Sequence, residues 1–336
     1  MCYDEGGKEM LPVKPHRLFA AAFAVLLTAY TGFVLLDTFV LPQTYRENAA
    51  GANLSLFSDN AETALSSAAQ QTETQSRTAA GETVSESAAQ SDPLPQSSEN
   101  TYSDGNMTVT LTEHRVNGTA VYAADVQLSS AQSLRTAFAQ DQFGRNITEK
   151  TSTIAAAHNA VLAINGDYCG AQERGIVIRN GVLYRETAGS SDVCCIYADG
   201  SMKTYAAGER TAADLTEEGV WQAFSFGPGL LADGQITVSA HDEVGRAMAS
   251  NPRTAIGMIS PLHYVFVVSD GRTAESEGLS LCELAEFMQT LGVQNAYNLD
   301  GGGSSAMVFQ GRLINKPTTT GTRIRERSVS DIVYIG

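Results

Sequence analysis

The sequence predicts an α+β fold: a mixed, hairpin-rich β-sheet core with a few packed helices, preceded by one transmembrane helix and a disordered spacer. Three features carry this prediction: an uncharged apolar run near the N-terminus, a polar low-complexity stretch behind it, and alternating apolar segments joined by tight turns. The expected divisions are a cytoplasmic tail at 1–17, a transmembrane segment at 18–41, a spacer at 42–103 and a folded domain at 104–336.

The N-terminal apolar run predicts a membrane anchor. Residues 18–36 carry no charge, and apolar residues resume after Asp37. At about 1.5 Å per residue, a helix of this length spans the ~30 Å hydrocarbon core of a bilayer. The alternative is a cleaved signal peptide, whose apolar region is shorter, about 7–15 residues, and ends at a small-x-small site. Lys8, Lys14 and Arg17 precede the run and favour a single-pass protein of the cell membrane with an extracytoplasmic C-terminal domain.

The stretch from about residue 43 to residue 100 forms the expected spacer. It is rich in Ser, Ala, Thr, Gln and Glu and has almost no aromatic residues. Such a composition buries too little apolar surface to offset the entropy lost on ordering. A spacer of this length suits a domain that is held away from the membrane.

Alternating apolar segments further along the chain predict β-hairpins. Asn117-Gly118, Asn180-Gly181 and Asp199-Gly200 are typical of two-residue hairpin turns. The strands expected around these turns are 107–112 with 120–128, 175–179 with 182–185, and 193–198 with 202–206. Further strands are expected at 161–165, 254–259, 264–269, 296–299, 306–310 and 331–335. This succession favours an α+β domain over a regular βαβ arrangement.

Two segments are typical of helices. Ser280 and Glu283 form a capping box, and Gly292 provides a natural stop for the helix that begins there. Its expected apolar stripe consists of Leu281, Leu284, Met288 and Leu291. Residues 151–158 are expected to form a second helix ahead of the strand at 161–165.

The composition excludes several classes of protein. Acidic side chains number 37 against 22 basic ones, for a formal charge of −15, so nucleic acid is not an expected partner. Five cysteines are too few for a disulfide-dense small scaffold. The hydrophobic fraction of 43% supports a sizeable core and excludes a wholly disordered chain.

The densest chemical signal is the glycine loop, residues 300–305, which reads Asp-Gly-Gly-Gly-Ser-Ser after an apolar strand. Gly301, Gly302 and Gly303 allow positive φ angles and a close approach of the backbone to a ligand. Their N–H groups can form an anion-binding nest, and Ser304 and Ser305 add hydroxyl donors. A mobile turn is the alternative. A P-loop is excluded because no Gly-Lys-Ser/Thr follows the glycines.

Three other clusters also place polar groups at the ends of apolar strands. They are Asn165-Gly166-Asp167, Arg253 at the start of its strand, and Asp270-Gly271-Arg272. An arginine fork suits phosphate or carboxylate. Each cluster alone is typical of a turn, but the combination indicates a binding or catalytic site.

With these motifs in this order, the sequence resembles the phosphodiester glycosidase family, the bacterial relatives of N-acetylglucosamine-1-phosphodiester alpha-N-acetylglucosaminidase. The resemblance rests on AINGDY, NPRTAIG, SDGR and NLDGGGSSAMV with GRLINKP behind it, and it spans residues 161–317. The anchor and the spacer lie outside it.

The resemblance implies hydrolysis of a sugar from a glycosyl-1-phosphodiester, and no cofactor is expected. Arg253, Arg272 and the glycine loop would bind the phosphodiester and stabilise charge on the departing phosphate. Asn165 and Ser304 would orient sugar hydroxyls or phosphate oxygens. Water activation, oxocarbenium stabilisation and nucleophilic attack remain open roles for three candidate carboxylates, which are Asp300, Asp270 and Asp167.

The exterior cysteines are expected to include one disulfide, from Cys169 to Cys194 or Cys195. The absence of a Cys-x-x-Cys motif and the scattered histidines leave no metal ligand to assign.

The function expected from these features is a membrane-anchored, extracytoplasmic hydrolase of glycosyl phosphodiesters or phosphorylated glycans in cell-wall or exopolysaccharide metabolism. The alternative is a non-catalytic module that binds phosphorylated envelope glycans through the same residues. Replacement of Asp300 by Asn separates the two, since only an enzyme depends on the carboxylate.

Overall fold

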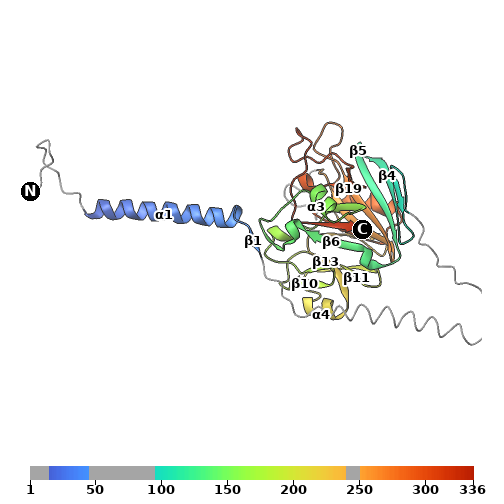
Figure 1. Cartoon of the computed structure of the whole chain (residues 1–336), viewed down its shortest axis with the longest axis horizontal. Helices are drawn as coiled ribbons and strands as arrows, with labels where there is room; N and C mark the ends of the chain where they lie inside the picture. The colour runs from blue at the N-terminus through green and yellow to red at the C-terminus, as the bar shows by residue number, and fades with distance from the viewer. Residues whose placement is uncertain (1–14, 45–94, 240–249) are drawn as a thin grey trace, which may run out of the picture.

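The computed structural model describes residues 15–44, 95–239 and 250–336 of the 336-residue chain (Figure 1). These ranges form a long N-terminal helix and a β-rich domain with three shorter α-helices. The predicted α+β class is confirmed. The expected spacer lies mostly outside the described residues.

Three antiparallel sheets build the domain. The large sheet has the strand order β15-β14-β18-β16-β17-β5-β4-β3-β2. Its strands are β2 (Gln96–Ser97), β3 (Thr101–Ser103), β4 (Met107–Val116), β5 (Thr119–Leu128), β14 (Gly229–Ala232), β15 (Gln235–Ile236), β16 (Thr254–Ser260), β17 (His263–Ser269) and β18 (Asn295–Asn298). Because β2 and β3 pair onto β4, the sheet already begins within the range expected to be spacer.

The other two sheets have five strands each. The second sheet has the order β20-β19-β8-β21-β6, and the third has the order β10-β9-β13-β11-β12. The second sheet contains β6 (Leu134–Phe138), β8 (Leu162–Asn165), β19 (Met307–Phe309), β20 (Arg312–Leu313) and β21 (Asp331–Ile335). The third contains β9 (Val177–Arg179), β10 (Val182–Arg185), β11 (Val193–Tyr197), β12 (Met202–Tyr205) and β13 (Val220–Phe224).

The main core lies where these three sheets meet. Phe266 from the large sheet, Ile164 from the second and Phe224 from the third belong to one cluster of buried side chains. Burial of apolar surface contributes about 25 cal/mol per Å², so this shared core is the main force that holds the sheets together.

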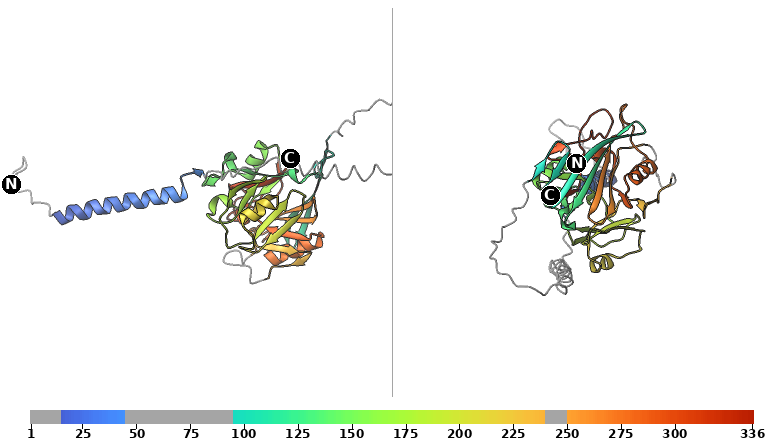
Figure 2. Two further views of the ribbon diagram at one scale, coloured as in Figure 1. Left: turned by 90° about the horizontal axis from the view of Figure 1, so that it is seen from below. Right: turned by 90° about the vertical axis from the view of Figure 1, so that its right-hand side faces the viewer.

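Helices cover the outer faces of the sheets. Helix α5 (Leu281–Thr290) lies on the large sheet, where Leu284 and Met288 pack into a second core with Val265 (Figure 2). Helix α3 (Thr151–Ala157) packs on the second sheet through Ile154, and α4 (Ala212–Glu217) packs on the third through Leu215. Short 3-10 turns complete the domain: η1 (Ala131–Ser133), η2 (Ala139–Asp141), η3 (Cys169–Ala171) and η5 (Gly302–Ser304).

Local sequence signals account for the hairpins and for the best-defined helix. Asn117 and Asn180 adopt positive φ at their Asn-Gly turns, as the turn type requires. At α5, the Ser280 hydroxyl accepts a hydrogen bond from the Glu283 N–H at 3.1 Å, and the Glu283 carboxylate accepts one from the Ser280 N–H at 2.8 Å. All the strands and both helices expected from the sequence are present.

The N-terminal helix α1 (Pro15–Phe39) projects from the domain. Its segment Phe19–Phe39 has 21 residues and a mean hydropathy of 2.1, and none of it is buried. By length and composition this helix could cross a membrane or serve as a signal sequence. Directly after it, β1 (Gln43–Thr44) pairs with β7 (Gly144–Arg145) of the domain.

Candidate active site

The predicted site residues gather at one edge of the large sheet. Strand β16 lies between β18 and β17, with Ala255 opposite Asn298 and Thr254 opposite Val268. Because β16 is antiparallel to both neighbours, its first residues lie beside the last residues of β17 and β18. Arg253, Asp270 and the glycine loop are therefore neighbours, although they are far apart in the sequence.

Asn165 joins the second sheet to this edge. It is fully buried at the end of β8, and its side-chain amide donates a 2.6 Å hydrogen bond to the Asp300 carbonyl oxygen. Its side-chain oxygen accepts hydrogen bonds from the Thr254 hydroxyl at 2.8 Å and from the Ala306 N–H at 3.2 Å. Asn165 therefore holds both ends of the glycine loop, a positioning role that differs from the expected contact with substrate.

The glycines of the loop are required by close packing. Gly302 has a φ of 62°, and its N–H donates to the Pro252 carbonyl oxygen at 2.8 Å. A Cβ at Gly301 would lie 2.9 Å from that same oxygen, and one at Gly303 would collide with the Thr319 hydroxyl. The Ser305 N–H donates within the loop, to Gly302. Several N–H groups expected to bind an anion are thus used by the fold itself.

Asp300 is a buried carboxylate with a charged partner. Its Oδ2 atom lies 3.0 Å from Nη2 of Arg327, whose guanidinium also donates to the Ser304 hydroxyl at 2.6 and 2.8 Å. Burial raises the pKa of Asp300 above its ordinary value, while Arg327, Ser304 and the Gly301 N–H act in the opposite direction. A proton can therefore reside on this carboxyl at a higher pH than on an exposed Asp.

Asp270 is the second buried carboxylate of the site. Its Oδ1 accepts hydrogen bonds from the Lys316 N–H at 2.7 Å and from the Asn315 amide at 3.4 Å. The Asn315 amide also donates to the Ser305 carbonyl oxygen at 2.9 Å, which connects Asp270 with the glycine loop. Burial raises the pKa of Asp270 as well.

The two predicted arginines have different surroundings. Arg272 is exposed, adopts a φ of 61° and lies against the loop, with Nη2 2.8 Å from the position of a Cβ on Gly302. It donates to the Asn251 side-chain oxygen at 3.1 and 3.2 Å and to the Thr319 carbonyl oxygen at 2.8 Å. Arg253 is buried and directs its Nε to the Leu279 carbonyl oxygen at 2.8 Å. Arg272 is thus the more exposed of the two predicted arginines.

Arg327 contacts the candidate carboxylate Asp300 and is a residue of this site that the sequence did not single out. The side chain is 40% exposed, so it connects the buried Asp300 with solvent. The available signal was the segment Lys316 to Arg327, which carries four basic residues and one acidic residue in a chain of formal charge −15.

Asp167 belongs to a separate buried cluster. Its Oδ1 lies 2.6 Å from Nη2 of Arg179, and its Oδ2 accepts a hydrogen bond from the Ser225 N–H at 2.8 Å. The same Arg179 nitrogen lies 3.1 Å from Asp331. Burial and the charge of Asp167 raise the pKa of Asp331 to about 6. Both oxygens of Asp167 are thus engaged by residues outside the glycine loop.

The Asp167 cluster also contains the described residues that best match a metal-ligand set. Asp167, Cys169 and Asp331 place their ligand atoms within 4.8 Å of one another. The guanidinium of Arg179 already forms ion pairs with both carboxylates there, and burial raises the pKa of the Cys169 thiol. A cation would compete with Arg179 and would need a thiolate that burial disfavours. These residues therefore do not fit a metal site.

The expected disulfide is wrong. Cys169, Cys194, Cys195 and Cys282 are all free thiols. Cys194 and Cys195 are adjacent on β11, so their side chains enter cores on opposite faces of the sheet, and Cys169 lies in a third cluster.

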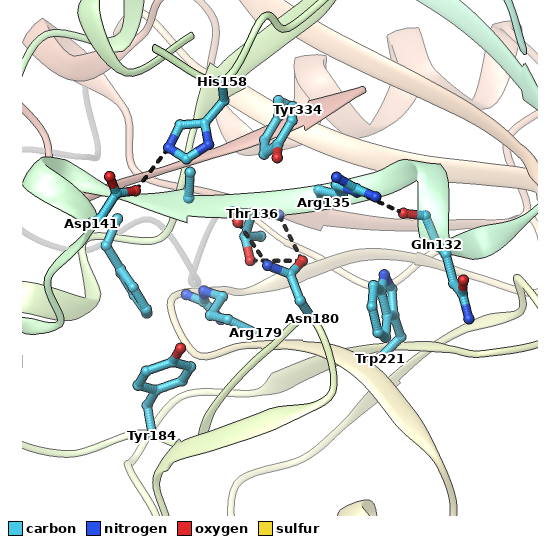
Figure 3. Close-up of a pocket in the computed structure, with 12 residues that line it drawn as sticks. Gln132, Arg135, Thr136, Asp141, His158, Arg179, Asn180, Tyr184, Trp221 and Tyr334 are labelled. Carbon is cyan, nitrogen blue, oxygen red and sulfur yellow. Dashed lines mark hydrogen bonds and ion pairs between the residues drawn. The ribbon is translucent and has the colours of Figure 1, made fainter. Parts of the chain in front are cut away.

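A cavity of about 400 Å³ lies between the second and third sheets, apart from the glycine loop (Figure 3). Arg179, Tyr184, Trp221 and Tyr334 are among its lining residues. Figure 3 shows Asn180 directed at the backbone of β6, where its side-chain oxygen accepts from the Thr136 N–H at 3.0 Å and its amide donates to the Thr136 carbonyl oxygen at 2.8 Å.

Two further side chains form hydrogen bonds with the backbone of β6 at this edge. The Leu134 carbonyl oxygen accepts hydrogen bonds from the Trp221 indole at 2.7 Å and from the Gln222 amide at 3.2 Å. Two side chains of the cavity lining, Asn180 and Trp221, thus form hydrogen bonds with the edge strand of the second sheet.

Comparison with known proteins identifies relatives of the domain. The sequence model of the family described as phosphodiester glycosidase matches residues 158–336. The SPbeta prophage-derived uncharacterized protein YomE of Bacillus subtilis is 32% identical over 179 residues, which are 52% of this chain and 28% of YomE. Mouse N-acetylglucosamine-1-phosphodiester alpha-N-acetylglucosaminidase is 44% identical over 66 residues, 20% of this chain and 13% of the mouse protein. The chain thus matches less than a third of the length of these relatives.

Solved structures show the same fold. The catalytic domain of zebrafish N-acetylglucosamine-1-phosphodiester alpha-N-acetylglucosaminidase, auto-inhibited by its pro-peptide, aligns with a TM-score of 0.54 at 22% identity over 68% of this chain and 82% of that one. A hypothetical protein from Synechocystis aligns with a TM-score of 0.52 at 16% identity over 68% of this chain and 62% of that one.

Proposed function

The chain belongs to the phosphodiester glycosidase family, and from this premise we propose that it hydrolyses a glycosyl-1-phosphodiester at the glycine loop. We further propose that the domain is anchored in the cell membrane by α1, faces the extracytoplasmic side and acts on phosphorylated glycans of the cell wall or exopolysaccharide. The run of apolar residues in α1 supports the anchor. The names of the curated relatives support a sugar phosphodiester as the substrate.

The observation that carries this proposal is the arrangement around Asp300. A buried carboxylate of raised pKa contacts the half-exposed Arg327, and Arg272 lies on the same glycine loop. Carboxylates catalyse the reaction at the anomeric carbon in glycoside hydrolysis, and guanidinium groups bind phosphate. The site therefore combines the two kinds of group that this reaction needs.

The proposed reaction adds water across the bond between the anomeric carbon and the phosphate oxygen. That C–O bond breaks, a new C–O bond forms to water, and the products are the free sugar, a phosphate monoester and a proton. A phosphate leaves without much protonation, so ionised Asp300 would assist attack or stabilise the oxocarbenium-like transition state. Arg272 and Arg327 would stabilise the charge that develops on the departing phosphate.

We propose different roles for Asp270 and Asp167. Asp270 is joined to the glycine loop through Asn315 and is the second candidate carboxylate. Asp167 is held by Arg179 and Ser225, so we assign it a structural role.

The test is sugar release by the full chain in detergent from an α-N-acetylglucosaminyl phosphodiester, compared with Asp300→Asn. We expect a loss of turnover of about 10²- to 10⁴-fold. Asp233→Asn is the matched control, since Asp233 is an exposed turn residue with a φ of 48°, which Asn also tolerates. Turnover that survives in Asp300→Asn would contradict the role of the carboxylate. Saturable binding with no turnover in the parent chain would favour the phosphorylated-glycan binding module instead.

A further inference from the structure

The junction between α1 and the domain is fixed by hydrogen bonds. Strand β1 pairs with β7 in antiparallel register, with Gln43 opposite Arg145 and Thr44 opposite Gly144. The Asn146 amide donates to the Leu41 carbonyl oxygen at 2.9 Å and to the Thr38 carbonyl oxygen at 3.4 Å. A domain residue thus binds the C-terminal end of the helix itself.

The packing at this junction leaves no room for an added side chain. A Cβ on Gly144 would collide with the Gln43 carbonyl oxygen. On the helix side, the Gln43 amide donates to the Asp37 side chain at 3.0 Å and to the Asp37 carbonyl oxygen at 3.2 Å. The domain is therefore seated against the end of α1, and Figure 1 shows β1 on the side of the domain that faces the helix.

Two short routes connect β7 with the candidate active site. In the first, a Cβ on Gly170 would lie 2.7 Å from both the Gly144 carbonyl oxygen and Cβ of Ser330, and the Gly170 N–H donates to the Ser330 hydroxyl at 3.2 Å. Ser330 lies three positions after Arg327, so their Cα atoms are at most about 11 Å apart. Arg327 in turn contacts Asp300.

The second route runs along the segment that follows β7. Glu149 forms a β-bridge with Val329, two residues after Arg327. Glu326 accepts hydrogen bonds from the Ser152 hydroxyl at 2.6 Å and from the Ser152 N–H at 2.9 Å. The arginine-bearing segment of the active site is thus attached to the same part of the domain that holds the end of α1.

Two exposed side chains, each two residues away from a member of these routes (Gly170 or Glu326), suit a bilayer surface. Tyr168, between β8 and η3, is 41% exposed, and Ile324, between Arg323 and Arg325, is 53% exposed. Tyrosine is enriched at membrane interfaces, and arginine beside an exposed apolar residue suits anionic headgroups. The domain as a whole is acidic, so this local basic segment is the part that such a surface would attract.

We propose that the substrate is a lipid-linked glycosyl phosphodiester, a sugar joined through one phosphate to a membrane lipid and presented at the bilayer surface beside α1. This inference rests on the proposed hydrolase function and on α1 as a membrane span. Hydrolysis breaks the bond between the anomeric carbon and oxygen, releases the sugar with a hydroxyl from water, and leaves the lipid phosphate monoester and a proton.

The test uses the full chain reconstituted in liposomes of phosphatidylethanolamine and phosphatidylglycerol. Two substrates with the same α-N-acetylglucosaminyl phosphate are compared, one esterified to a polyprenol and one to methanol. We expect kcat/KM at least tenfold higher for the polyprenyl compound. Asn146→Gly removes both hydrogen bonds to the end of α1 and suits the φ of 59° at this position. In this variant we expect the preference to fall at least threefold while hydrolysis of the methyl compound is unchanged.

The matched control is Asn159→Gly, at an exposed Asn that also has positive φ, which should keep the full preference. Amide hydrogen exchange at Gly144 and Arg145 should rise in Asn146→Gly and not in the control. Equal kcat/KM for the two compounds in the parent chain would overturn the lipid-linked substrate and leave the hydrolase intact. Hydrolysis of neither compound would remove both proposals.

Discussion

The glycine-loop site and the Asp167 cluster are both built from carboxylates and arginine, but the solvent exposure of the arginine differs between them. In the cluster, Arg179, Asp167 and Asp331 each have side chains only 1% exposed, and one guanidinium holds two carboxylates. At the loop, Asp300 is buried, whereas its partner Arg327 is 40% exposed. This difference indicates that an ion pair buried from solvent stabilises the fold, whereas an ion pair with one exposed member can contact a substrate.

The largest expected effect is on stability, from Arg179→Met. Removal of one partner from a buried ion pair costs about 3–5 kcal/mol, because the remaining charges lose their compensation. The loss should be smaller at pH 5 than at pH 8. Burial and the charge of Asp167 raise the pKa of Asp331 to about 6, and Arg179→Met removes the main contribution that lowers it. As pH falls from 8 to 5, the native variant therefore gains more free energy from protonation than the native parent, which offsets part of the loss.

Urea unfolding of parent and variant at both pH values checks this prediction. Arg210→Met is the control, since the ion pairs of Arg210 lie at the surface, where such pairs contribute about 0–1 kcal/mol. A deficit for Arg179→Met that does not shrink at pH 5 would show that the carboxylates are not the source of the loss.

The next effect is on the pH dependence of activity. If ionised Asp300 is required, kcat/KM should fall as pH falls through the pKa of this carboxyl, which burial places above 3.8. Stability should respond in the opposite sense, because the native state binds this proton more readily than the unfolded state. A pH–rate profile from pH 3 to 8, read beside unfolding curves, measures both. Activity that rises steadily toward acid would assign Asp300 the role of a general acid instead.

A smaller effect is expected from Arg272→Lys. The charge is kept, but the planar fork that contacts Asn251 and Thr319 is lost. Hydrogen bonds to charged groups contribute about 1.5–3 kcal/mol, so kcat/KM should fall about 10- to 100-fold. Steady-state kinetics with unchanged thermal stability would support contact with phosphate. An unaltered kcat/KM would remove Arg272 from the site.

The smallest effect is expected from Ser305→Ala. The Ser305 hydroxyl is buried and has no hydrogen-bond partner among the described residues. A buried hydroxyl without a partner costs free energy, so its removal should leave the stability equal or raise it by about 1 kcal/mol. Thermal unfolding measures this change. A clear decrease in melting temperature would mean that the hydroxyl has a partner in solution.

Strand periodicity and turn chemistry predicted most of the fold because both are local signals. The Asn-Gly turns and the capping box at Ser280 are examples. Strands β6, β13 and β14, helix α4 and the strands of only two or three residues at β1, β2, β3, β7, β15 and β20 were missed. Helix α4 has its own capping box, Thr211 with Asp214, which the sequence displayed. Strand β6 lacks such a signal, because its pairing partner β21 lies almost 200 residues away along the chain.

The sequence predicted most residues of the candidate site but not the different environments of its carboxylates. Asp300, Asp270 and Arg272 lie around the glycine loop as the strand ends indicated. The sequence treated Asp167 and Asp300 alike because each follows a strand beside glycine. Their environments depend on Arg179 and Arg327, which come from other strands and segments, so local pattern could not separate them.

The closed edge of β6 has a consequence for the behaviour of the protein at high concentration. An open strand edge offers unpaired N–H and carbonyl groups to any other chain and is a common start of aggregation. Here Asn180 and Trp221 occupy hydrogen-bonding positions of Thr136 and Leu134 that a foreign strand would need. The amide and indole side chains therefore protect this edge, which faces a cavity, against the addition of a foreign strand.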